Sequence, residues 1–153
     1  MKFLNKFLFL SVLAMSLTLV SCSDDDKGPG STEELVGMWE VVEGTEWEKE
    51  DGEIVYEDDD YNGDLRYEFK ANGTYNRYYK SGSSWYNDEN GTYSYKKGTL
   101  TMFDEDEEES YSATVKALTA TTLEIESYAS FNEDGSHYEA YVSFKFKRIS
   151  SAD

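Results

Sequence analysis

The stretch SHYEAYVSFKFKRI, residues 136–149, alternates two kinds of side chain along its length. Successive side chains of a β-strand point to opposite faces, so every second residue shares a face. One face receives Tyr138, Ala140, Val142, Phe144 and Phe146. The other face receives mainly charged and polar residues. The alternation therefore predicts a long strand with one side in a core and the other in solvent.

The same two-residue period recurs from residue 31 onward, between turn signals such as Asp51-Gly52, Asn72-Gly73 and Asn90-Gly91. After a short helical turn at 32–35, it predicts strands at residues 37–49, 53–57, 64–70, 74–80, 85–86 with 92–96, 99–103, 111–118, 122–128 and 136–149. Sequential hairpins favour an all-β antiparallel meander, which removes its edges by closing into an up-and-down eight-stranded barrel. A two-sheet sandwich is the alternative.

The composition limits the class of protein. The chain has 153 residues, 16% of them aromatic, and a formal net charge of -18. This length fits one domain, and the aromatic content predicts a packed core. The negative charge argues against nucleic acid as a partner, because nucleic acid attracts basic surfaces. One cysteine and one histidine are too few for a zinc site or an intrachain disulfide.

The N-terminal residues predict export and a lipid anchor. Two lysines precede an apolar stretch that ends in small residues, as in a cleaved signal peptide. Residues 19–22, LVSC, resemble a bacterial lipobox, in which a lipid is attached to Cys22. Residues 23–27, SDDDK, resemble the acidic signal that sends Bacteroidota lipoproteins to the outer face of the outer membrane, or they form a solvated linker. The expected division is a signal peptide at residues 1–21, a lipidated tether at 22–31 and a monomeric barrel domain at 32–150.

Four segments follow one another in a recognisable order: 35–39 (LVGMW), 67–75 (YEFKANGTY), 91–95 (GTYSY) and 115–125 (VKALTATTLEI). Together they resemble the lipocalin-like domain of small Bacteroidota lipoproteins. The resemblance implies a lipocalin-like barrel in which Trp39 of the first strand plugs the closed end and Arg148 covers its ring through a cation–π contact. The chain is shorter than full-length lipocalins and has no cysteine pair, which leaves the size of its cavity open.

Tyrosine carries the candidate ligand site. The chain has 13 Tyr, and a buried phenol needs a hydrogen-bond partner, so tyrosine favours cavities and rims. The pattern places these candidates toward the barrel interior: Tyr67, Tyr75, Tyr93, Tyr95, Met102, Tyr138 and Phe144. An eight-stranded barrel is wide enough to hold one small ligand or to be filled by side chains. We expect an apolar or aromatic ligand. The alternative is a filled barrel that serves as an accessory module for a protein or glycan partner.

Residues 58–64 contain the D-x-D-x-N-G spacing of calcium loops, with candidate ligands Asp58, Asp60, Asn62 and Asp64. Phe69 stands where the twelfth-position acid belongs, so an Asx-rich turn is the other interpretation. No cofactor is expected beyond weak calcium binding. The sequence has no G-x-S-x-G, H-E-x-x-H or phosphate-binding glycine loop, and we expect the protein not to be an enzyme.

Overall fold

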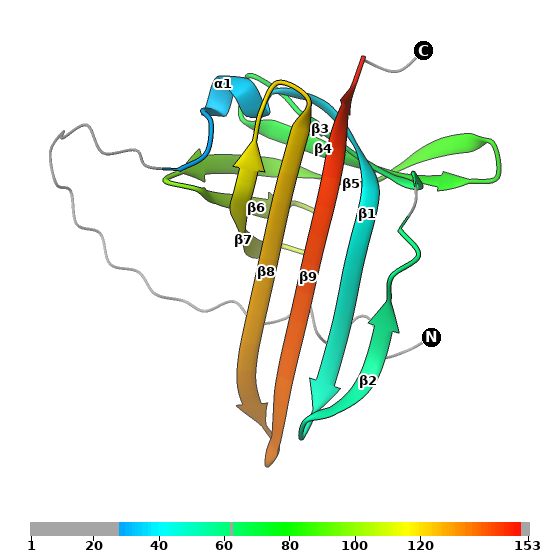
Figure 1. The fold of residues 1–153 in the computed structure, drawn as a ribbon, viewed down its shortest axis with the longest axis vertical. Coiled ribbons are helices and arrows are strands. Elements are labelled where there is room, and N and C mark those ends of the chain that lie inside the picture. The colour runs from blue at the N-terminus through cyan, green and yellow to red at the C-terminus, as the bar shows by residue number, and fades with distance from the viewer. Residues whose placement is uncertain (1–27, 62, 151–153) are drawn as a thin grey trace, which may run out of the picture.

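The computed structural model describes residues 28–61 and 63–150, which form one short helix and nine antiparallel strands (Figure 1). The elements are α1 (Thr32–Leu35), β1 (Gly37–Glu50), β2 (Glu53–Asp58), β3 (Leu65–Phe69), β4 (Thr74–Ser81), β5 (Ser84–Lys96), β6 (Thr99–Asp104), β7 (Glu109–Leu118), β8 (Thr122–Glu133) and β9 (Ser136–Ile149). Within this part of the chain, no helix has the length and apolar character to cross a membrane. The predicted signal peptide, Cys22 and the acidic residues after it lie outside the described residues.

Eight of these strands close into an antiparallel barrel. Each strand from β3 to β8 pairs with the next strand along the chain, and β9 returns to pair with β1. The ring is completed by residues 37–40 of β1, which pair with β3. β2 stands outside the ring, because it pairs only with the far half of β1, at residues 46–50. The predicted barrel is therefore confirmed, and the sandwich alternative is wrong.

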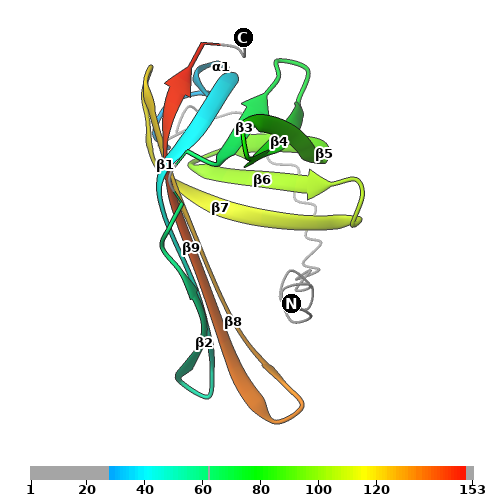
Figure 2. The ribbon, with the colours of Figure 1, turned by 90° about the vertical axis from the view of Figure 1, so that its right-hand side faces the viewer.

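Three barrel strands, β1, β8 and β9, continue past the barrel and form a ribbon together with β2. β8 pairs with β9 along its whole length, but with β7 only at residues 123–126. Beyond that point β8 and β9 leave the barrel wall, and β1 with β2 runs beside them. Figure 2 shows these strands extending well beyond β6 and β7. We define the ribbon as residues 44–50, 53–58, 127–133 and 136–143.

Aromatic and aliphatic side chains fill the barrel interior. The largest fully buried ones are Trp39, Tyr75, Phe146, Leu35, Leu100, Leu123 and Val41. The buried rings pack both stacked and edge to face; for example, Tyr67 stacks on Phe69 with centroids 6.0 Å apart, and Phe69 meets Tyr93 edge to face with centroids 5.0 Å apart and the planes at 72°. The indole Nε1 of Trp39 donates to the carbonyl oxygen of Leu35 at 2.8 Å. Removal of these side chains from water supplies the main driving force for folding.

Trp39 and Arg148 close one end of the barrel. The two residues face each other across β1 and β9, and the Arg148 guanidinium lies 4.1 Å from the centroid of the Trp39 ring. Arg148 also donates to three backbone carbonyl oxygens, those of Glu34, Val36 and Ala120. The cation–π contact expected from the lipocalin resemblance is therefore present, and it is reinforced by hydrogen bonds that connect three segments of the chain.

The described end of the predicted tether packs against the barrel. The Tyr95 hydroxyl donates to the carbonyl oxygen of Pro29. Ser31 is the N-cap of α1 and forms a capping box with Glu34. Gly30 lies so close to Leu118 that an added Cβ atom would be 2.7 Å from its side chain. Pro29, Gly30 and Ser31, which the sequence analysis placed in the tether, are therefore part of the folded domain.

The predicted turn at Asn90-Gly91 is wrong. Both residues lie inside β5, where Gly91 pairs with Tyr75 on one side and Asp104 on the other. A Cβ atom at Gly91 would lie 1.9 Å from the carbonyl oxygen of Phe103. Glycine is needed here because a neighbouring strand approaches closely, and not because the chain turns.

Candidate ligand site at the open end of the barrel

The two ends of the barrel differ. Turns of an up-and-down barrel alternate between its ends, and the β7–β8 turn lies at the end closed by Arg148, which donates to the carbonyl oxygen of Ala120 at 2.8 Å. The β4–β5, β6–β7 and β8–β9 turns therefore lie at the other end, from which the ribbon projects (Figure 2). We call this second end the open end.

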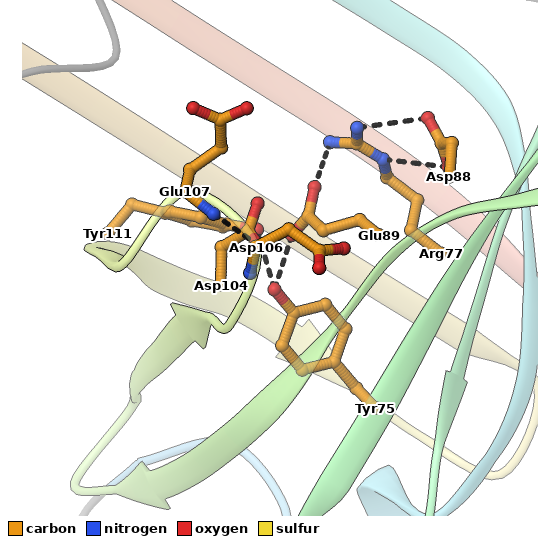
Figure 3. A network of polar contacts seen from close by, with 8 residues as sticks. All are labelled: Tyr75, Arg77, Asp88, Glu89, Asp104, Asp106, Glu107 and Tyr111. Carbon is orange, nitrogen blue, oxygen red and sulfur yellow. Dashed lines mark hydrogen bonds and ion pairs between the residues drawn. The ribbon is translucent and has the colours of Figure 1, made fainter.

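A buried polar cluster lies inside the barrel near the β6–β7 turn (Figure 3). The Glu89 carboxylate accepts a hydrogen bond from the Tyr75 hydroxyl and pairs with the Arg77 guanidinium, although Glu89 is only 3% exposed. The Tyr75 hydroxyl also lies 2.8 Å from that of Tyr111. A charge can stay buried this deeply because each of its oxygen atoms has a partner.

A β-bulge brings a second carboxylate to the same arginine. The pairing of β4 with β5 shifts between Arg77 and Tyr78, so that Arg77 faces Glu89 and Tyr78 faces Asn87. Asp88 is the extra residue of the bulge, and its two oxygen atoms accept hydrogen bonds from Arg77 at 3.0 and 3.3 Å. Arg77 is thereby fixed between one buried and one exposed carboxylate.

Burial changes the acidity of the cluster. It raises the pKa of Glu89 above the ordinary value, although the charge of Arg77 and the hydroxyl of Tyr75 act in the opposite direction. Burial also raises the pKa of Tyr67 to about 12. Burial and the hydrogen bond to Glu89 raise the pKa of Tyr75 as well. Both tyrosines therefore stay protonated at neutral pH, and Tyr75 donates its hydroxyl hydrogen to Glu89.

Four apolar side chains at the open end pack against the core but remain partly exposed, and we call them the rim: Tyr61, Leu65, Tyr111 and Phe144. The rings of Tyr61 and Phe144 meet edge to face, with centroids 5.0 Å apart. Gly44 makes room for this contact, because an added Cβ atom would lie 2.7 Å from the Phe144 ring. Tyr111 connects the rim to the polar cluster. Its ring is part of the rim, and its hydroxyl lies beside that of Tyr75 in the polar cluster.

The structure brings most of the sequence-predicted ligand residues together in the core: Tyr67, Tyr75, Tyr93, Tyr95 and Met102 are all less than 10% exposed. Their hydroxyls are largely engaged within the chain, as when Tyr93 donates to the carbonyl oxygen of Lys70 at 2.9 Å. Phe144 lies at the rim. Tyr138 is not inside the barrel, because it lies on the ribbon, where its hydroxyl donates to Glu50 at 2.9 Å.

Two of the four residues of the proposed calcium loop, Asp58 and Asp64, have other partners. One carboxylate oxygen of Asp58 accepts a hydrogen bond from the backbone amide of Asp60 at 3.0 Å, which is an Asx turn. The Asp64 carboxylate lies 3.9 Å from the Lys80 ammonium group. Asn62 lies outside the described residues. In the part of the chain that is described, no three Asp, Glu, His or Cys side chains are grouped to hold a metal ion.

Sequence reasoning missed Arg77 and Glu89, because a charged residue in an alternating pattern is normally assigned to the solvent face. A usable signal was present. Arg77 is two residues from Tyr75, and Glu89 is four residues from Tyr93, so both share a face with residues that were correctly predicted to point inward.

The comparison with protein families matches the model of the lipocalin-like domain to residues 35–125. The chain belongs to the lipocalin-like domain family. A comparison with curated proteins gives no match. Among solved structures, a lipocalin-like protein from Bacteroides uniformis has a TM-score of 0.51 at 14% identity, over 76% of this chain and 99% of its own. This likeness shows the lipocalin-like fold.

Two further structures are similar to this lipocalin-like chain. A protein from Bacteroides eggerthii has a TM-score of 0.49 at 13% identity, covering 74% of this chain and 98% of its own. Bovine odorant binding protein, in complex with a selenium-containing odorant, has a TM-score of 0.39 at 18% identity, covering 86% of this chain and 80% of its own.

Proposed function

We propose that this lipocalin-like protein is a non-catalytic binding protein that takes a small molecule with an apolar or aromatic body at the open end of its barrel. One observation carries the proposal. The rim keeps four apolar side chains partly exposed beside a buried cluster of hydroxyl, guanidinium and carboxylate groups. Binding sites for small molecules combine apolar walls with a few fixed polar groups in this way.

The ligand lies on the rim in this proposal, and not among the deeper tyrosines. Tyr93 and Tyr95 are less than 10% exposed, and their hydroxyls already donate to backbone carbonyl oxygens. A ligand at their position would have to displace packed rings. On the rim, the apolar body would contact Phe144 and Leu65, while polar groups of the ligand would reach toward Tyr111.

The proposal includes export and lipid attachment at Cys22, with the protein on the outer membrane and directed to the cell exterior. The hydrogen bond between Pro29 and Tyr95 supports a particular orientation of the barrel relative to the membrane. Tyr95 lies at the C-terminal end of β5, which is the end away from the β4–β5 turn, so the tether meets the barrel at its closed end. Five residues lie between Cys22 and Gly28, so the chain from one to the other spans at most about 20 Å. The closed end would then lie near the membrane and the open end would point away from it.

Displacement of the neutral fluorescent probe Nile red tests the binding site. We expect the mature chain to bind the probe, and Phe144→Ala to weaken binding about tenfold, because the variant removes a large part of the rim. Phe103→Ala is the matched control, since Phe103 is a strand phenylalanine that is 38% exposed outside the rim. Equal binding by both variants would contradict a site at the rim.

A glycan-binding surface is the second candidate. The outer side of the ribbon carries Trp47 and Tyr141 stacked with centroids 5.6 Å apart, beside Tyr128, which is 57% exposed. Flat aromatic groups of this kind can stack on sugar rings. Affinity electrophoresis in gels that contain envelope polysaccharide tests it: Trp47→Ala should abolish a retardation that Phe144→Ala leaves unchanged.

A further inference from the structure

A chain of hydrogen bonds runs from the rim into the polar cluster (Figure 3). The Tyr111 hydroxyl lies 2.8 Å from that of Tyr75, and the Tyr75 hydroxyl donates to Glu89. Tyr75 is fully buried and Glu89 is only 3% exposed, whereas Tyr111 is partly exposed. The chain therefore connects a carboxylate inside the barrel to a hydroxyl beside the rim.

The carboxylate at the buried end fixes the direction of both hydrogen bonds. Arg77 pairs with one oxygen of Glu89, and Tyr75 donates to the other, so Glu89 acts as an acceptor. A phenol has a single hydrogen, and that of Tyr75 is used in this bond. The Tyr75 oxygen must then accept the hydrogen of Tyr111. Tyr111 has thereby used its only hydrogen within the protein, and its oxygen offers only lone pairs to a ligand.

The second hydroxyl of the rim is used in the same way. Tyr61 donates to a carboxylate oxygen of Glu46 at 2.5 Å, so its hydrogen also points into the protein. The other two rim residues, Leu65 and Phe144, have no polar atom in their side chains. The side chains of the rim therefore present hydrogen-bond acceptors and no donor.

This pattern selects among the polar groups that a ligand can bring to the rim. A carbonyl or ether group brings only lone pairs, and burial of an acceptor without a donor is unfavourable. A carboxylate also adds a negative charge beside the acidic residues 104–109 at the β6–β7 turn. A hydroxyl group, in contrast, supplies the hydrogen that the rim lacks.

We infer that the ligand of the open end is an alcohol or a phenol, whose hydroxyl group donates to the Tyr111 oxygen while its apolar body lies on the rim. This inference rests on the proposed function and names the class of its ligand. Tyr111 is the residue that contacts the polar group of the ligand. Tyr75 and Glu89 are positioning residues, because they set the direction in which the Tyr111 hydroxyl points.

Three probes with the same apolar body separate the donor from the apolar contact: octylphenol, its methyl ether and octylbenzoate. Displacement of Nile red from the mature chain at neutral pH gives their affinities. The ether carries a methyl group in place of the hydroxyl hydrogen, so apolar burial alone would favour the ether over the phenol. We expect the phenol to bind about fivefold more tightly than the ether, which corresponds to one hydrogen bond, and the benzoate to bind most weakly.

Tyr75→Phe tests the direction of the chain. It removes the acceptor of the Tyr111 hydrogen, which is then free to point to the ligand, so the preference should reverse in favour of the ether. Tyr93→Phe is the matched control, because it also removes a buried phenol hydroxyl, one that donates to the carbonyl oxygen of Lys70 in the β3–β4 turn, and it should keep the preference. Tyr111→Phe changes a partly exposed residue and should abolish the preference, even if Tyr75→Phe does not fold.

The outcomes separate this inference from the proposed function. Equal affinities of the phenol and the ether for the natural chain would overturn the inference while the proposed function stands. A benzoate that binds as tightly as the phenol, or a preference that Tyr111→Phe leaves unchanged, would overturn it as well. Failure of all three probes to displace Nile red would overturn both.

Discussion

Replacement of Arg148 by alanine should lower the free energy of unfolding by about 3 kcal/mol. Arg148 donates to the carbonyl oxygen of Val36 at 2.6 Å in a partly buried contact and to that of Ala120 at 2.8 Å in an exposed one. A hydrogen bond from a charged donor contributes about 1.5 to 3 kcal/mol when it is buried, and less when water can replace the donor. The cation–π contact with Trp39 adds about 0.5 to 1 kcal/mol.

Urea unfolding followed by tryptophan fluorescence measures this loss. Arg66→Ala is the control, because Arg66 also lies over a ring, 3.8 Å from the centroid of Trp85, and pairs with Glu40. Glu40 keeps a second cation, Lys147 at 2.8 Å, so the control should cost only about 1 kcal/mol. Arg148→Lys should restore part of the stability, since an ammonium group cannot reach all the carbonyl oxygens that the guanidinium fork serves. An Arg148→Ala variant as stable as Arg66→Ala would refute the role assigned to the closed end.

Three further predictions concern the strands, the buried acid and the anchor. Gly91→Ala should destabilise the protein more than Gly135→Ala in urea unfolding. An added Cβ atom at Gly91 would lie 1.9 Å from the carbonyl oxygen of Phe103, whereas at Gly135 it meets nothing within 4 Å and costs only the backbone strain of a φ of +92°. Equal losses would contradict the close strand approach. The raised pKa of Glu48 means that its stabilising contribution is complete below the ordinary value of 4.5 and is lost as the pH rises through the raised value. Glu48→Gln should therefore be more stable than the natural chain at pH 7 and equal to it near pH 4, and a less stable variant at pH 7 would speak against the assignment. Cys22→Ser should abolish incorporation of a palmitate analogue in cells and release the protein from the membrane fraction, whereas retained labelling would exclude the anchor.

The barrel was predictable from sequence because its core obeys a simple period. Residues such as Tyr93, Tyr95 and Phe146 alternate with polar neighbours, and each of them is buried in the structure. The pairing of Trp39 with Arg148 was predictable from the family resemblance, because it depends on two residues at the ends of the first and last strands.

The candidate site was harder to predict, because it depends on where strands stop pairing. Tyr138 has the correct parity for the interior, but β8 and β9 leave the barrel before they reach it, and no local pattern marks that point. Glu46, Glu48 and Glu50 follow a shift in the pairing of β1 with β9 between Val41 and Glu43, which moves their side chains onto the inner face. Bulges and strand length are set by tertiary pairing, so alternation alone does not predict which face these acids occupy.

The central claim is that ligand binds at the open end of the barrel. Titration of the isotope-labelled mature chain with Nile red, followed by amide chemical shifts, tests it directly. We predict that the largest shifts fall on the four residues of the rim, Tyr61, Leu65, Tyr111 and Phe144. Shifts confined to the outer aromatic group around Trp47, or to the closed end around Trp39, would contradict the account.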